Sequence, residues 1–101
     1  MRHVLIVHES ESIRVDLARE FLAEGFTVAE ADSALAAVRE IWQGSFVAVV
    51  IGERLPGMNG TSLEEQVHGL APEVITLPIG RDPPARLVRK LADILDGAVA
   101  A

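Results

Sequence analysis

The sequence predicts an α/β domain in which a parallel β-sheet carries helices on both of its faces. Short, wholly apolar runs such as Val4–Val7 and Phe46–Ile51 are typical of strands that are buried on both sides. Between these runs, apolar residues recur every three or four positions, which is the period of a helix that packs along one side. Alternation of strand and helix favours a parallel sheet with right-handed crossovers. A chain of 101 residues fits one such domain.

The first three elements follow directly from this pattern. Val4–Val7 is the first strand, and a polar loop follows it. The first helix is predicted over Ser12–Glu24, with Gly25 at its end. Phe26–Glu30 is the second strand.

The second helix is predicted to begin at a capping Asp32 or Ser33 and to end at Gly44. Its larger apolar residues recur at helical spacing, so we expect them to face the sheet together. These residues are Leu35, Val38, Ile41 and Trp42.

The third strand is Phe46–Ile51, and a loop rich in turn-forming residues follows it as far as Gly60. A short third helix then carries apolar residues at helical spacing, namely Leu63, Val67 and Leu70. Val74–Leu77 is the fourth strand.

The last helix follows Pro83 and Pro84 and separates its apolar from its charged residues. The side expected to face the core carries Leu87, Val88, Leu91, Ile94 and Leu95. Gly97 is expected to end this helix. The domain is therefore predicted to span residues 1–97, with residues 98–101 as a frayed tail.

Composition narrows the classes of function. Fifteen acidic and nine basic residues give a net charge of −6, so we expect neither nucleic acid nor a membrane as a direct partner. The absence of cysteine excludes disulfides, thiolate catalysis and cysteine-ligated zinc. The longest apolar run has six residues, far fewer than the ~20 that span a bilayer. Since the N-terminus has no cleavable signal pattern, a cytoplasmic location is expected.

The segment Phe46–Gly60 resembles the middle of a bacterial response-regulator receiver domain. In that family, an apolar strand ends in an aspartate that becomes phosphorylated, and a Met-Pro-Gly-Met-Asp-Gly type loop follows. Here the strand ends at Gly52, and Leu55–Gly60 matches the loop. Arg14 matches an arginine that the family carries in its first helix. The resemblance implies a flavodoxin-like receiver fold.

The resemblance also implies that the chemistry of phosphorylation has been lost. A receiver holds Mg²⁺ with two acidic residues, accepts a phosphoryl group on aspartate, and holds the product with a hydroxyl and a lysine. The corresponding positions here are His8 and Glu9, Gly52, and Pro78, and no lysine precedes the last helix. We expect these four residues to form a vestigial pocket without catalysis, metal or cofactor, in which His8 could equally be an ordinary loop histidine.

A deletion separates this chain from the family pattern. Only five residues lie between Pro78 and Pro84, where the family has a helix and a fifth strand. The resemblance implies a sheet truncated to four strands in the order 2-1-3-4, so Val74–Leu77 becomes an outer strand with an unpaired edge. The last helix, a second copy or another protein could cover that edge, or Pro72 and Pro78 could blunt it.

The leading hypothesis is a phosphorylation-independent receiver-like module that acts through protein–protein interaction or dimerisation in bacterial two-component-type signalling. The alternative is a sensor that binds a metal or small anion in the vestigial pocket. An enzyme is not expected, because no nucleophile and base converge. The expected contact residues are Val74, Ile75, Thr76, Leu77, Leu55, Met58, Arg86, Arg89 and Lys90, of which the last three also fit an ordinary solvated helix face.

Overall fold

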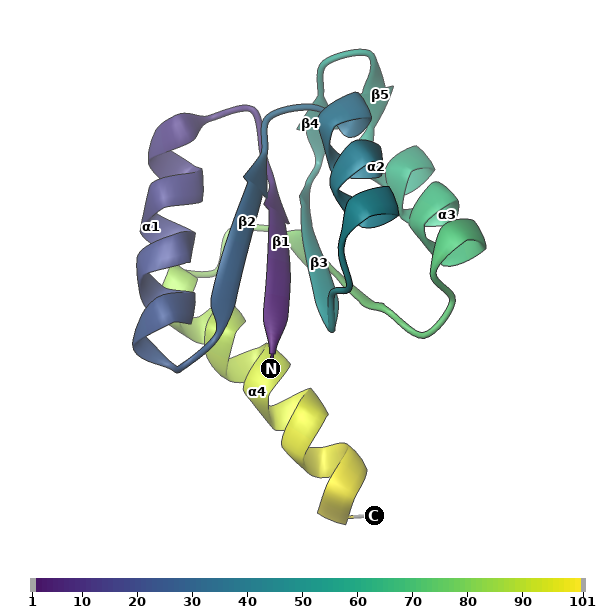
Figure 1. Ribbon diagram of the computed structural model, residues 1–101. Coiled ribbons are helices and arrows are strands. Elements are labelled where there is room, and N and C mark those ends of the chain that lie inside the picture. The colour runs from purple at the N-terminus through teal and green to yellow at the C-terminus, as the bar shows by residue number, and fades with distance from the viewer. Residues whose placement is uncertain (1, 101) are drawn as a thin grey trace.

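The computed structural model describes residues 2–100, which form a parallel four-stranded sheet between two layers of helices (Figure 1). The strands are β1 (His3–Val7), β2 (Thr27–Ala31), β3 (Ala48–Gly52) and β6 (Ile75–Ile79). They lie in the order β2-β1-β3-β6 and pair in parallel throughout. The predicted α/β class and strand order are therefore confirmed.

The helices are α1 (Glu11–Ala23), α2 (Ala34–Gln43), α3 (Gly60–Leu70) and α4 (Pro84–Ala100). Helices α1 and α4 cover one face of the sheet, and α2 and α3 cover the other (Figure 1). No helix or strand lies between β6 and α4, as the short connection implies. Within residues 2–100, no helix is both long and apolar enough to cross a membrane.

A small hairpin that the sequence analysis did not predict follows β3. It consists of β4 (Arg54–Leu55) and β5 (Met58–Asn59), which pair antiparallel. Gly57 has a φ of 79°, the left-handed conformation that a type II turn requires after proline. The turn-forming residues of this segment therefore build a defined hairpin beside the end of β3.

The core has two halves because successive strand residues point to opposite faces of the sheet. Val4 and Ile6 of β1 pack with α1 and α4, while Leu5 and Val7 pack with α2 and α3. All four side chains are fully buried. Burial on both faces explains why these strands are apolar at every position.

Helix α2 faces the sheet with a different side from the one predicted. Ala34 and Ala37 are buried, whereas Leu35 and Trp42 are 63% and 72% exposed. Val38 and Ile41 are partly buried, as expected of inward residues. The prediction was wrong for Leu35 and Trp42 because α2 packs on the sheet through the small residues Ala34 and Ala37, which leaves these two larger side chains facing outward.

The predictions for the last two helices also need correction. Leu70 and Ile94, which were expected to face inward, are 41% and 38% exposed. Helix α4 continues through Gly97 to Ala100 and extends past the end of the sheet (Figure 1). Gly97 does not end the helix, because its φ is not positive and no left-handed turn forms there. Ala101 of the predicted tail lies outside the described residues.

The outer edge of β6 has few backbone hydrogen-bond donors. The Ile75 N–H donates to the Val47 carbonyl of the neighbouring chain segment. The backbone N–H and C=O groups of successive strand residues point to opposite sides. Because those of Ile75 point toward β3, those of Thr76 and Pro78 point away from it. Pro78 has no N–H, so within β6 only Thr76 offers an outward donor. Helix α4 packs its buried residues in the same cluster as Leu77 and so covers a face of β6.

Gly60 is required because the end of β3 approaches the start of α3 closely. A Cβ atom at Gly60 would collide with the Gly52 carbonyl oxygen, whereas one at Gly69 of the same helix would meet nothing within 4 Å. Gly60→Ala should therefore lower the free energy of unfolding by about 1–3 kcal/mol, the usual cost of overpacking. Gly69→Ala is the matched control and should be neutral or raise it by up to about 1 kcal/mol. Urea unfolding of both variants measures the difference, and equal stabilities would contradict the close approach.

Candidate functional site

The carboxyl ends of the parallel strands bring the predicted pocket residues to one edge of the sheet. His8 follows β1 directly, Gly52 ends β3, and Pro78 pairs in register with Ile51. Gly52 and Pro78 line the same cavity of about 170 Å³. His8 lines a neighbouring cavity of about 250 Å³ between α1 and the β6–α4 connection. Ligand sites of open α/β sheets lie at this edge.

The His8 imidazole occupies the space into which a side chain at position 52 would grow. A Cβ atom at Gly52 would lie 2.9 Å from His8 Cδ2 and 3.3 Å from His8 Cγ. It would also lie 3.3 Å from the Val7 carbonyl oxygen. Because the obstructing atoms belong to a ring near its attachment point, they cannot move aside as the end of a flexible chain could. The residues at positions 8 and 52 are therefore sterically coupled.

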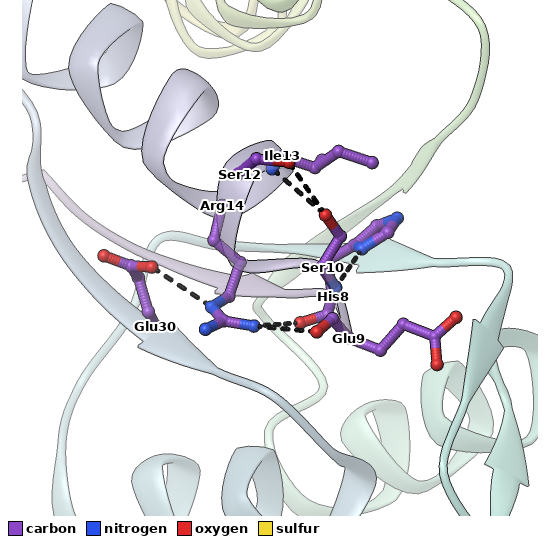
Figure 2. Close-up of polar contacts among 7 residues, drawn as sticks. All are labelled: His8, Glu9, Ser10, Ser12, Ile13, Arg14 and Glu30. Atoms are coloured by element: carbon purple, nitrogen blue, oxygen red, sulfur yellow. Dashed lines mark hydrogen bonds and ion pairs between the residues drawn. The ribbon is translucent and has the colours of Figure 1, made fainter.

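A hydrogen bond fixes the orientation of this ring. The Ser10 backbone N–H donates to His8 Nδ1 over 2.9 Å (Figure 2). Neutral His8 therefore carries its proton on Nε2, since Nδ1 serves as the acceptor. Ser10 also caps α1 by accepting a hydrogen bond from the Ile13 N–H at 3.4 Å. The start of α1 and the ring position thus depend on the same residue.

Burial lowers the pKa of His8 below its ordinary value of 6.5. The nearby Arg14 guanidinium lowers this pKa further, while the Glu9 carboxylate opposes the shift. Protonation would also place a proton on Nδ1, where the Ser10 N–H already points. The neutral ring is therefore the form that fits this site at neutral pH.

Arg14 holds the loop between β1 and α1. Its Nη1 donates to the His8 carbonyl at 2.7 Å and to the Glu9 carbonyl at 3.3 Å. Its Nε donates to Glu30 Oε1 at 3.2 Å, which ties the loop to β2 (Figure 2). The Arg14 side chain is only 14% exposed. The sequence analysis matched Arg14 to the family pattern without giving it this structural role.

Glu9 differs from the other predicted pocket residues in its exposure. Its side chain is exposed, and Figure 2 marks no contact to its carboxylate. Only its backbone carbonyl takes part in the Arg14 contact. Among residues 2–100, no group of three or more His, Asp or Glu side chains is arranged to hold a metal ion.

The predicted contact residues do not form one surface. Leu55, Val74 and Leu77 are buried, and Leu77 belongs to the opposite half of the core from the other two. Met58 is partly buried beside α2 and α3. The predicted contact residues whose side chains are exposed lie on α4. Arg86, Arg89 and Lys90 line an open hollow on α4 together with Asp82, Asp93 and Ile94. Of the contact residues, these three cations are the ones that present exposed side chains together.

Two exposed residues that the sequence analysis assigned to the core are candidates for contact instead. Leu35 and Trp42 lie seven residues apart on α2 and therefore on nearly the same face of the helix. Their helical spacing is the same whether they face the core or solvent, so the pattern could not separate the two cases. The alanines at positions 34 and 37, which the structure buries, are a feature of the sequence that could have indicated the rotation.

Comparison with known proteins identifies the fold. No protein-family model matches this chain, and no curated protein matches it. A CheY-like response regulator receiver domain protein from Methanospirillum hungatei JF-1 matches with a TM-score of 0.86 and 22% identity, over 96% of this chain and 95% of that one. The response regulator TrrA from Thermotoga maritima, in complex with Mg²⁺ and BeF, matches with a TM-score of 0.78 and 16% identity, over 93% and 99%.

A third match comes from the histidine kinase ThkA in complex with TrrA, with a TM-score of 0.73 and 18% identity over 87% of this chain and 80% of that one. The chain has the receiver fold. Structural matches with sequence identities this low establish a shared fold and nothing about a shared function. In the receiver fold of this chain, His8, Gly52 and Pro78 stand at the carboxyl edge of the sheet, and the sheet ends at β6.

The steric coupling between His8 and Gly52 can be measured with a double-mutant cycle. Gly52→Ala should destabilise this receiver fold by about 1–3 kcal/mol, because the new methyl group meets the imidazole. In a His8→Ala background the same substitution should cost at least about 1 kcal/mol less, since the obstructing ring is gone. Urea unfolding of the four proteins gives the coupling energy. Additive effects would contradict the coupling.

The lowered pKa of His8 predicts how stability changes with pH. When the pKa of a histidine is lower in the folded protein than in the unfolded chain, its contribution to stability is complete at pH values above the unfolded pKa, here 6.5. That contribution is lost as the pH falls below 6.5 toward the folded pKa, because the unfolded chain takes up the proton first. The wild type should therefore lose more stability than His8→Gln between about pH 7.5 and pH 5. Parallel curves for the two proteins would show that the ring is not shielded from protonation.

Proposed function

We propose that this chain is a non-catalytic receiver-like signalling module that works without phosphorylation in two-component-type regulation. It acts by binding another protein or a second copy of itself. The single observation that carries the proposal is the position of the His8 ring, 2.9 Å from the point where any side chain at Gly52 would begin. The pocket therefore lacks an acceptor and also lacks the room for one.

Further features of the same pocket support this proposal. Pro78 stands where the receiver family carries a hydroxyl, and Glu9 is the one acidic residue that remains of the metal-binding pair. The Glu9 side chain is exposed, and the His8 Nδ1 atom is already engaged by the Ser10 N–H. Without an acceptor carboxylate at position 52, the exposed Glu9 carboxylate is by itself a poor site for Mg²⁺.

The comparisons suggest which kind of partner such a module has. TrrA is described with Mg²⁺ and BeF in one structure and in complex with the histidine kinase ThkA in another. By analogy, this chain contacts a signalling protein of the two-component type, but without the metal-dependent step.

The exposed cations of α4 are the most accessible of the contact residues predicted from the sequence. Arg86, Arg89 and Lys90 present their side chains to solvent. The edge of β6 is less suited to adding a strand, because Pro78 supplies no N–H and Thr76 supplies the one outward donor of that strand. We therefore propose that contact on this side of the molecule is made through α4 side chains.

The proposal predicts that phosphoryl donors and their analogues leave the protein unchanged. Adding Mg²⁺ with beryllofluoride should move no amide resonance at residues 8, 9 or 52, and acetyl phosphate should add no phosphoryl group by mass spectrometry. Light scattering should give the same molar mass with and without acetyl phosphate. TrrA, treated identically, is the positive control for the Mg²⁺–BeF reagent.

Two outcomes would overturn this proposal in different ways. A phosphorylated product would mean that another residue has taken over the role of acceptor. Saturable shifts at residues 8, 9 and 52 with Mg²⁺ or a small anion alone would instead support a sensor that binds its ligand in this pocket.

A further inference from the structure

A hollow of about 250 Å³ lies on the α2 and α3 side of the molecule, near the amino end of β3. It is lined by the last residues of α2, the connection to β3, and the end of α3 with its following loop. Its lining includes Ile41, Trp42, Phe46, Leu70 and Glu73. The hollow is therefore at the opposite end of the sheet from His8 and Gly52.

The hollow has an aromatic wall that the fold leaves open to solvent. Trp42 is the only tryptophan of the chain and is 72% exposed, and Leu70 across the hollow is 41% exposed. A tryptophan offers a large contact area, and here Trp42 and Leu70 expose apolar surface on two sides of one hollow. Phe46 is partly buried at the base, where its ring stacks on His3 at a centroid distance of 4.6 Å.

The electrostatics of the hollow favour a positive charge. Glu73 is the only charged residue among those that line it. Helices α2 and α3 both end at the hollow, so the partial negative charges of their C-termini converge there. Helix α2 has no basic residue in its last turn to offset this charge, and α3 has only His68, which does not line the hollow. Arg39 lies one turn earlier on α2 and does not line the hollow.

We infer that this hollow is a docking site for an arginine or lysine side chain of a partner protein. The indole of Trp42 offers an electron-rich face on which a cation binds favourably, and Glu73 supplies the opposite charge. The apolar residues Ile41 and Leu70 suit the aliphatic stem of such a side chain. This inference rests on the proposed function in taking the domain to work by binding a protein.

The occupant is another protein rather than a second copy for two reasons. The chain carries a net charge of −6, so copies repel one another while a cationic partner is attracted. Three exposed cations that lie together on this chain, Arg86, Arg89 and Lys90, are on α4, which covers the other face of the sheet. Their insertion into the hollow of a second copy would join two different surfaces, and such a contact extends into open chains unless it closes into a ring.

The test uses a fragment that carries only the proposed chemistry. Butylguanidinium is titrated into ¹⁵N-labelled protein, and butylurea serves as its neutral analogue of similar shape. Butylguanidinium should produce saturable shifts of the Trp42 indole N–H and of the amides of residues 70, 71 and 73, and butylurea should bind at least about threefold more weakly. Glu73→Gln should weaken butylguanidinium binding about threefold or more without changing butylurea binding.

Variants on the same helix give the matched controls. Trp42→Ala should abolish the shifts at residues 70, 71 and 73, whereas Leu35→Ala should leave them unchanged, because Leu35 is equally exposed but lies outside the hollow. Circular dichroism checks that each variant is folded. Equal binding of the two fragments, or no effect of Glu73→Gln, would overturn the inference of a cationic ligand.

The oligomeric state distinguishes the two occupants. The wild type should remain monomeric by light scattering as its concentration rises. Self-association that both Trp42→Ala and Arg89→Glu abolish would make a second copy the occupant and overturn the assignment to another protein. The tests of the hollow are read at residues 42 and 70–73, whereas the tests of the proposed function are read at residues 8, 9 and 52. Either hypothesis can therefore fail while the other holds.

Discussion

The close packing around the end of β3 is the constraint on which the rest of this site depends. On one side, the His8 ring approaches Gly52 so closely that a Cβ atom there would lie 2.9 Å from it. On the other side, the Gly52 carbonyl lies against the Cα atom of Gly60 at the start of α3. Helix α3 can begin where it does because Gly60 lacks a side chain, and the His8 ring can lie where it does because Gly52 lacks one. At the edge of the sheet that holds ligands in related folds, the space beside Gly52 is therefore occupied by the His8 ring.

The polar contacts at this edge stabilise the position of the His8 ring. Arg14 binds the carbonyls of His8 and Glu9 and also Glu30 on β2, so the loop that carries the imidazole is tied to the neighbouring strand. The Ser10 N–H then fixes the ring through Nδ1. These bonds use groups that would otherwise be free to meet a ligand. The same contacts therefore fix both the loop and the imidazole that lies beside Gly52.

The two layers of helices are packed differently, and this difference determines which surfaces remain open. Helix α4 buries Leu87, Val88 and Leu91 against α1 and the sheet, so its exposed side carries mainly charges. Helix α2 instead buries alanines and leaves Leu35 and Trp42 in solvent. The two most exposed large apolar side chains therefore lie on α2, while the cations Arg86, Arg89 and Lys90 lie together on α4.

The sequence by itself determined the α/β class, the approximate position of each main element and the identity of the residues at the pocket. Apolar runs and helical spacing are local features, and Gly52 and Pro78 are read directly at the ends of two strands. Only the tertiary structure decided that α2 turns Trp42 outward, that α4 continues through Gly97, and that the His8 ring fills the space beside Gly52. Periodicity fixes the spacing of a helical stripe but not which stripe is buried, since that depends on how closely alanine lets the helix approach. The contact between His8 and Gly52 joins residues far apart in the chain, and such contacts are set by the pairing of β1 with β3.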